Sequence, residues 1–138
     1  MKKVMAFGSF DVFHKGHENY LRQAKELGDK LVVIVSRDSN IKKLKKQEPW
    51  FSEDKRVKTV SRYDAVDKAI LGNEDDLLQV VVDEKPSILC LGFDQKVDDK
   101  KLKKELEKRG LKDFKITRAN AYKPEIFKSS KLKKTMKK

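Results

Sequence analysis

Residues 31–35, Leu31-Val-Val-Ile-Val35, form an uninterrupted apolar run in which every residue after the first is β-branched. Such a run is typical of a strand that is buried on both faces, and these strands are characteristic of parallel sheets covered by helices. On either side of it, short apolar runs alternate with stretches in which apolar residues recur at helical spacing. We therefore predict a parallel sheet whose strands are joined by right-handed helical crossovers.

The residues between these stretches set the expected element boundaries. Gly28 and Gly110 each follow a helical pattern, where glycine is common, and Ser52 followed by two acidic residues is a favourable helix start. We expect strands at residues 4–7, 31–35, 65–71, 87–91 and 114–117, and helices at residues 17–27, 39–46, 52–62, 75–84 and 98–109.

This order predicts a single doubly wound α/β domain over residues 1–138, with a five-stranded parallel sheet and helices on both faces. Sheets of this type bind ligands beyond the carboxyl ends of their strands, where the strand order reverses. Candidate functional residues are therefore those that directly follow each expected strand. Residues from about 135 to 138 are expected to be a disordered basic tail.

Composition narrows the classes of protein to which the chain can belong. No apolar run approaches the roughly 18 residues of a transmembrane helix, and the apolar stretch near the amino terminus is too short for a signal peptide. Cys90 is the only cysteine, which excludes an internal disulfide and a cysteine-based metal cluster. We expect a cytoplasmic protein with no membrane partner, in which Cys90 is a small buried apolar residue.

The chain has 138 residues and a formal net charge of +12, which indicates a polyanionic partner. Seven lysines and one acidic residue in residues 123–138 account for half of this charge. Nucleic acid, anionic lipid and small phosphorylated molecules are all candidates by charge alone. Neither this segment nor the lysine cluster at 42–46 has the aromatic interleaving or zinc-finger spacing of a nucleic-acid module. A non-enzymatic nucleic-acid binder is therefore the less favoured hypothesis.

The segment that carries chemistry follows the first expected strand and reads Gly8-Ser-Phe-Asp-Val-Phe-His-Lys-Gly-His17. It contains the only two histidines of the chain, at an expected helix start. A helix amino terminus offers unpaired N–H groups and a positive dipole end to phosphate, and imidazole N–H groups add donors. Gly8 and Gly16 would allow close backbone approach. Zinc would need a further ligand cluster, which does not appear, and the remaining alternative is that both histidines are ordinary surface loop residues.

This segment resembles the G-x-F-D-x-x-H-x-G-H signature of the cytidylyltransferase-like nucleotidyltransferases, which have a Rossmann-like fold. The resemblance extends along nearly the whole chain, through Ser36-Arg-Asp38, Arg56, Leu91-Gly-Phe-Asp-Gln95 and Ser129-Ser130. It implies transfer of a nucleotidyl group from a nucleoside triphosphate to a phosphorylated acceptor, by in-line attack on the α-phosphorus and with release of pyrophosphate.

Within this family, Val66-Asp-Lys-Ala-Ile-Leu-Gly72 and Leu91-Gly-Phe-Asp-Gln95 most resemble the archaeal type of FAD synthetase. That resemblance implies ATP and FMN as substrates, a divalent cation such as Mg²⁺, and a homodimer. The alternative is a glycerol-3-phosphate-type cytidylyltransferase that uses CTP. Members of that group have Gly-Asp-Asp-Trp where this chain has Gly92-Phe-Asp-Gln95, and a second arginine where this chain has Asp64. The sequence leaves the choice between ATP and CTP open.

The resemblance also implies roles for individual residues. His14, His17, Lys46 and Arg56 would form the catalytic set, with both histidines donating to the triphosphate. The nucleotide would contact Gly8, Ser9, Phe10, His14, Gly16, His17, Gly92, Asp94, Arg118, Ser129 and Ser130, and the acceptor would contact Asp11, Asp38, Arg56 and Gln95. Asp11 and Asp38 would hold Mg²⁺ at most indirectly, and no residue is expected to ligate a metal directly.

Two aromatic residues precede the helix start at Ser52. We expect Trp50 and Phe51 to anchor their loop, because aromatic side chains usually pack for bulk, with stacking on a flavin ring as the alternative.

Overall fold

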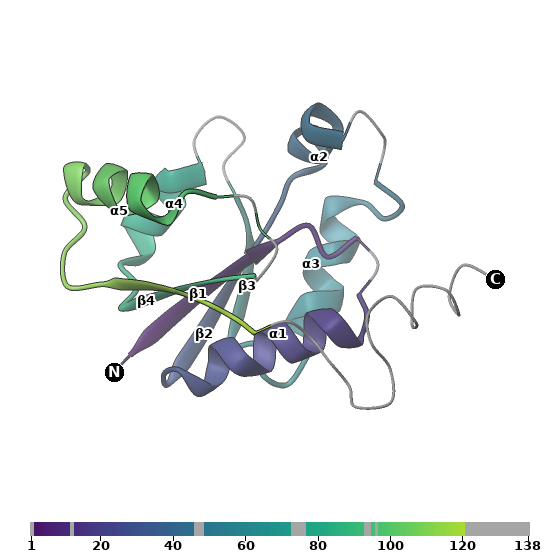
Figure 1. The fold of residues 1–138 in the computed structure, drawn as a ribbon. Helices are drawn as coiled ribbons and strands as arrows, with labels where there is room; N and C mark the ends of the chain where they lie inside the picture. The colour runs from purple at the N-terminus through teal and green to yellow at the C-terminus, as the bar shows by residue number, and fades with distance from the viewer. Residues whose placement is uncertain are drawn as a thin grey trace.

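The structure is a computed structural model that describes residues 2–11, 13–45, 49–72, 77–92, 95 and 97–120. Strands and helices alternate along the chain, except where two helices follow the second strand (Figure 1). The strands are β1 (Lys3–Gly8), β2 (Lys30–Val35), β3 (Lys68–Leu71), β4 (Ile88–Leu91) and β5 (Lys115–Arg118), and the helices are α1 (Lys15–Glu26), α2 (Asp38–Lys45), α3 (Glu53–Ser61), α4 (Leu77–Glu84) and α5 (Asp99–Lys108).

All the strands are parallel and form a single five-stranded sheet in the order β3-β2-β1-β4-β5. From the central strand β1 the chain first winds outward through β2 and β3, and then crosses back to place β4 on the other side of β1. The strand order therefore reverses between β1 and β4, which confirms the predicted doubly wound sheet. A ligand crevice is expected at the carboxyl ends of these two strands.

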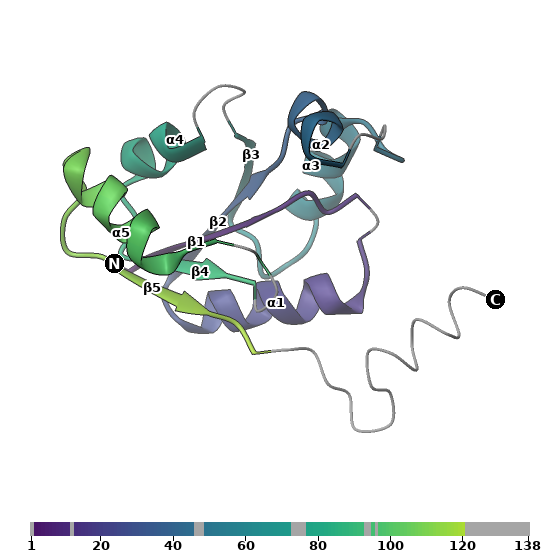
Figure 2. The same cartoon turned by 45° about the horizontal axis from the view of Figure 1, so that its top comes forward.

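Different helices cover the two faces of the sheet. Successive side chains of a strand point to opposite faces, so the helices that they contact can be assigned to one face or the other. Val4 and Ala6 of β1 pack in one buried cluster with Leu21 of α1 and Val60 of α3. Met5, which lies between them on the strand, packs in a second cluster with side chains of α4 and α5. The sheet thus has α1 and α3 on one face and α4 and α5 on the other (Figure 2).

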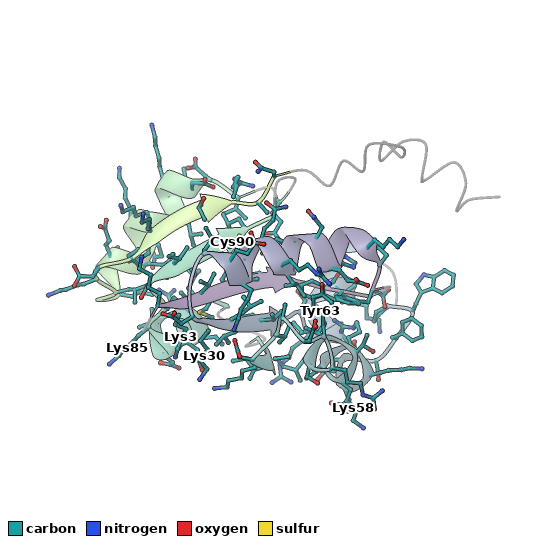
Figure 3. The ribbon with its side chains drawn as sticks, turned by 90° about the horizontal axis from the view of Figure 1, so that it is seen from below. Lys3, Lys30, Lys58, Tyr63, Lys85 and Cys90 are labelled. Carbon is teal, nitrogen blue, oxygen red and sulfur yellow. The ribbon has the colours of Figure 1, made fainter. Side chains whose placement is uncertain are left out.

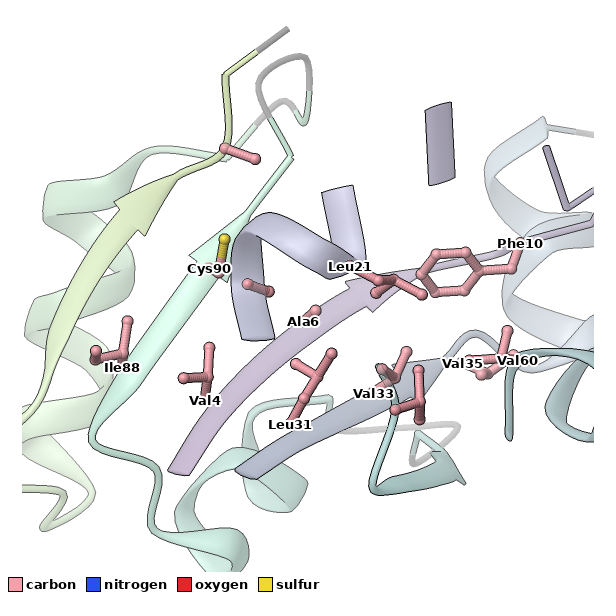
Figure 4. Close-up of a cluster of buried hydrophobic side chains, with 13 residues drawn as sticks. Val4, Ala6, Phe10, Leu21, Leu31, Val33, Val35, Val60, Ile88 and Cys90 are labelled. Carbon is pink, nitrogen blue, oxygen red and sulfur yellow. The ribbon is translucent and has the colours of Figure 1, made fainter. Parts of the chain in front are cut away.

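The first cluster extends along the whole length of the two central strands. Figure 4 shows it running from Val4 and Leu31, near the start of the strands, to Val35 and Phe10 at their carboxyl ends. Cys90 belongs to the same cluster and is 1% exposed, as predicted for a small apolar residue, and burial raises the pKa of its thiol to about 11. The apolar core therefore reaches directly under the segment that carries the histidines.

The start of the third strand was predicted wrongly. It begins at Lys68 instead of residue 65, because the preceding residues form a turn that closes α3: the Val66 amide donates to the Tyr63 carbonyl at 3.0 Å. Val66 is buried in the core from this turn, so its apolar character was misread as part of a strand. The Asp67 carboxylate then accepts the Leu31 amide at 2.7 Å.

Gly28 does end the region of α1, but for a different reason from the one predicted. A side chain at this position would place its Cβ 2.7 Å from the Lys2 carbonyl oxygen and 2.8 Å from Val4 Cγ2. Glycine is therefore needed because the turn into β2 passes directly against the start of β1. Gly110, by contrast, has a φ of +102° and ends α5 in the left-handed conformation typical of this position.

Within the described residues no helix is both long and apolar enough to cross a membrane.

The amino ends of the strands are held by a carboxylate at the end of α4. Glu84 pairs with Lys3 of β1 at 3.2 Å and with Lys68 of β3 at 3.1 Å, and its carbonyl accepts a further bond from the Lys3 ammonium. Lys3 lies beside Lys30, its register partner on β2 (Figure 3). Partial burial raises the pKa of the Glu84 carboxyl, but the two ammonium groups outweigh it and the net shift is below the ordinary value of 4.5.

Replacing this carboxylate should change how stability depends on pH. A depressed pKa in the folded state means that the carboxylate stabilises the fold above about pH 4.5, and that this contribution is lost as pH falls through the folded value. Glu84→Gln should therefore lower the free energy of unfolding by roughly 1 kcal/mol at neutral pH. Urea titrations at several pH values should show this difference shrinking in acid. Asp83→Asn, at an exposed neighbour, is the control; an equal effect of both variants would contradict the role of Glu84.

Candidate active site

The segment between β1 and α1 lies at the carboxyl end of the central strand, beside the reversal of strand order. His14 is the N-cap of α1, and its Nδ1 accepts the Gly16 amide at 3.0 Å. His17 Nδ1 in turn accepts the His14 amide at 3.3 Å. The pair forms a reciprocal capping box in which histidines replace the usual hydroxyl and carboxylate residues. The helix consequently begins at Lys15, two residues before the predicted start.

This capping fixes the chemistry of the two imidazoles. Because each Nδ1 accepts a hydrogen bond, the proton of each neutral ring lies on Nε2. The rings stack with centroids 4.0 Å apart, and desolvation lowers the pKa of His14 below its ordinary value of 6.5. His14 is therefore neutral at neutral pH and keeps one N–H donor beside the amino terminus of α1. Such donors suit anionic oxygens.

The buried ring of Phe10 packs against His17. Phe10 adopts a φ of +50°, rare for a bulky residue, and its side chain is 2% exposed. Its ring packs edge-on against His17, with centroids 5.1 Å apart, and covers Gly8, where a Cβ would lie 2.9 Å from the ring carbons. The buried ring leaves the Phe10 backbone as the part available to a nucleotide, and the predicted contact stays a prediction. Gly8 leaves room for this ring, and the ring positions His17.

Asp11 joins the histidine segment to the loop before α3. Its Oδ2 accepts the Trp50 amide at 2.8 Å, and its Oδ1 accepts the Phe51 amide at 2.9 Å. Both carboxylate oxygens are thus used within the protein. Asp11 therefore has a positioning role, and its predicted contact with the acceptor stays a prediction.

Arg56 is the most deeply buried charged residue that the structure describes, with 1% exposure. Its guanidinium donates to the carbonyls of Phe51 at 3.0 Å, Ser9 at 2.9 Å and Ser36 at 2.6 Å, and to Asp38 Oδ1 at 2.6 Å. It therefore joins the carboxyl ends of β1 and β2 to the loop before α3. Asp38 serves as the counter-ion of Arg56, and the predicted contacts of Arg56, Asp38 and Ser9 with substrates stay predictions.

A second arginine organises the other side of β1. Arg118, at the end of β5, donates through Nη1 to the carbonyls of Gly92 and Gln95, both at 2.8 Å. Its Nη2 donates to the Val97 carbonyl at 2.8 Å and pairs with Asp99 at 2.8 Å. These bonds join Gly92, Gln95 and Val97 to the end of β5. They give Arg118 a structural role, and its predicted contact with the nucleotide stays a prediction.

Side chains bridge β1 and β4 where the two strands separate. The last paired residues are Ala6 and Cys90. Beyond them, the Tyr20 hydroxyl of α1 accepts the Phe7 amide at 3.0 Å and donates to the Cys90 carbonyl. Gln95 completes the bridge, because its Nε2 donates to the Phe7 carbonyl at 2.8 Å and its Oε1 accepts the Gly92 amide at 3.1 Å. Gln95 thus links the ends of β1 and β4, and its predicted contact with the acceptor stays a prediction.

Two positioning residues were not singled out from the sequence. The spacing of Tyr20 predicts a core residue of a helix. Nothing in that spacing indicates that its hydroxyl bonds the Phe7 amide and the Cys90 carbonyl, two groups that no longer pair with each other's strand. Glu53 reads only as a favourable first-turn acid, yet its Oε1 accepts the Asp38 amide at 2.9 Å and its Oε2 pairs with Arg37 at 3.2 Å.

Four predicted site residues lie outside the described residues: Lys46, Asp94, Ser129 and Ser130. Among the residues that are described, no group of three or more histidine, cysteine, aspartate or glutamate side chains could hold a metal ion.

Comparisons with known proteins identify relatives of this chain in sequence and in fold. Residues 5–135 match the family described as cytidylyltransferase-like. A protein of Thermoplasma acidophilum named FAD synthase is 46% identical over 97% of this chain and 93% of its own length. One from Archaeoglobus profundus with the same name is 49% identical over 80% of this chain and 70% of its own length. The fold also matches a crystal structure from Thermoplasma volcanium, described as that of the lipopolysaccharide core biosynthesis protein, with a TM-score of 0.84. The two sequences are 43% identical, and the match covers 88% of this chain and 98% of the Thermoplasma volcanium chain.

Removing the buried guanidinium should destabilise the fold. Arg56→Ala leaves several carbonyls and the Asp38 carboxylate without their donor, so we expect the free energy of unfolding to fall by about 3 kcal/mol. Urea denaturation followed by circular dichroism measures this change. Arg22→Ala removes an exposed arginine and serves as the control. A variant at position 56 as stable as the control variant would contradict the assigned role.

The capping role of His14 can be separated from its imidazole chemistry. Asparagine is a good N-cap residue and alanine is not, so His14→Ala should lose about 1 kcal/mol of stability while His14→Asn stays close to the native chain. Thermal and urea unfolding of the two variants provide the comparison. Equal losses in both would mean that the cap contributes nothing to folding.

Proposed function

The chain belongs to the cytidylyltransferase-like family, and we propose that it is an FAD synthase that transfers AMP from ATP to FMN and releases pyrophosphate. The observation that carries the proposal is the pair of capped histidines at the amino terminus of α1, beside the reversal of strand order. Relatives named FAD synthase, at 42–49% identity, supply the choice of nucleotide and acceptor.

The reaction that we propose is an in-line displacement. An oxygen of the FMN phosphate attacks the α-phosphorus of ATP, the bond between that phosphorus and the bridging oxygen of pyrophosphate breaks, and the electron pair leaves on pyrophosphate. Little covalent work by the protein is needed, so positioning and charge stabilisation dominate. The Nε2–H groups of His14 and His17 would donate to the triphosphate oxygens, where negative charge grows as the bond breaks. The amino terminus of α1 adds its dipole.

The residues around the histidines act by holding them and the strand ends in place. Arg56 and Asp11 fix the loops on the β2 side of β1, and Arg118 and Gln95 fix the loop that follows β4. A preorganised set of donors avoids reorganisation during the reaction, which is where much catalytic advantage arises. Lys46, Asp94, Ser129 and Ser130 are proposed as further substrate contacts from the family resemblance.

Mg²⁺ would enter with the triphosphate, because this ion commonly keeps several waters and binds mainly through substrate phosphates. Its chemical contribution would be to offset phosphate charge. A cytoplasmic homodimer is part of the same proposal.

Incubation of the protein with FMN, ATP and Mg²⁺ should yield FAD and pyrophosphate in equal amounts. Separation of the flavins by chromatography and a coupled pyrophosphate assay provide the measurement. CTP with glycerol 3-phosphate is the matched arm for the cytidylyltransferase alternative. Activity confined to that second arm, or no FAD with any divalent cation, would refute the proposal.

Loss of the imidazole at position 14 should reduce turnover strongly. His14→Asn keeps the helix cap but cannot reproduce the Nε2–H donor, so we expect a loss of about 2–4 kcal/mol of transition-state stabilisation, or roughly 30- to 1,000-fold in turnover. Steady-state kinetics of this folded variant measure the effect. Turnover within about twofold of the native enzyme would exclude His14 from the chemistry.

A further inference from the structure

Trp50 does not anchor its loop, contrary to the expectation from the sequence. Its side chain is 82% exposed, although it is the only tryptophan of the chain. Phe51, the next residue, is 37% exposed, and the Lys55 ammonium lies 4.7 Å from the centroid of the Phe51 ring. We refer to Trp50, Phe51 and Lys55 as the aromatic platform. Large aromatic side chains in water leave apolar area that a planar ligand can cover.

The backbone beneath the platform is fixed, even though its rings are exposed. The amides of Trp50 and Phe51 are both bound by the Asp11 carboxylate, and the Phe51 carbonyl accepts from buried Arg56. An exposed aromatic ring on a fixed backbone loses little conformational freedom when a ligand binds. This is the property that makes a preorganised contact effective.

The same contacts place the platform close to the histidines. Asp11 precedes His14 by three residues, so their Cα atoms are separated by at most about 11 Å. The Asp11 side chain bridges directly to the platform, which lies on the β2 and α3 side of β1. The loop that holds Gly92 lies on the opposite side, next to β4. A ligand that extends from the histidines toward the platform is therefore separate from one that extends toward β4.

We propose that the aromatic platform binds the isoalloxazine ring of the acceptor, by stacking on Trp50, while its phosphate reaches the histidine site. This inference rests on the proposed function, which requires a phosphorylated acceptor with a large planar ring. The platform matches that chemistry, because it combines exposed aromatic faces with the Lys55 cation beside the Phe51 ring.

Flavin fluorescence tests binding directly, without turnover. Stacking on an indole quenches flavin emission, so titration of FMN with the native protein should lower its fluorescence to saturation. Trp50→Ala should weaken this binding about tenfold or more, and Trp50→Phe should recover part of the loss. Leu27→Ala, which trims an apolar residue exposed to a similar extent as Phe51 at the far end of α1, should bind FMN like the native chain. Circular dichroism of each variant checks that the fold is intact.

Kinetics distinguish the platform from other roles of Trp50. We expect Trp50→Ala to raise the KM for FMN about tenfold, with the KM for ATP unchanged and kcat within about twofold. A rise in the KM for ATP instead would assign the platform to the nucleobase and overturn the proposal. So would unchanged FMN binding, or a Trp50→Ala variant that only converts a dimer into a monomer in sedimentation velocity.

The same experiments separate this inference from the proposed function. If the native protein makes FAD and Trp50→Ala binds FMN equally well, the platform fails and the FAD synthase activity stands. If the native protein binds FMN in a Trp50-dependent way and makes no FAD, the platform stands and the FAD synthase activity fails.

Discussion

The separation of β1 from β4 is the constraint on which the rest of the site depends. Parallel strands that part must leave backbone groups without strand partners, and buried backbone groups without partners are costly. Here the Tyr20 hydroxyl and the Gln95 amide take over those groups at Phe7, Cys90 and Gly92. The carboxyl ends of β1 and β4 are thus held in place by the side chains of Tyr20 from α1 and of Gln95 from beyond β4.

Two arginines satisfy further backbone groups on the two sides of β1. Arg56 donates to carbonyls at the ends of β1 and β2, and Arg118 donates to the carbonyls of Gly92 and Gln95. Guanidinium groups suit this task, because several donors in a fixed plane can satisfy carbonyls from different segments at once. Part of the positive charge that first indicated a polyanionic partner is therefore used inside the protein. Under the proposed function, the phosphates would instead meet imidazole N–H donors and the amino terminus of α1.

The sequence alone was sufficient to predict the doubly wound parallel sheet. The β-branched run of β2 and the serine before α3 depend on local physics, and the predicted starts of α3 and α5 differ from the observed ones by one residue, whereas that of α1 differs by two. The roles of Phe10, Asp11 and Arg56 could not be predicted in this way, since each depends on partners far along the chain. Trp50 was misjudged for the opposite reason: aromatic bulk suggests packing, and no local pattern shows that the core has no place for it.

The state of Cys90 has a practical consequence for studying this protein. Its thiol is buried, and its pKa of about 11 keeps it protonated, whereas alkylating reagents react with thiolates. Toward maleimide dyes and spin labels the native chain therefore behaves as though it had no cysteine. A cysteine introduced on a surface loop can be labelled selectively without first removing the native one. Two such cysteines, one in the loop before α3 and one at the start of α5, would allow the distance between these two segments to be measured.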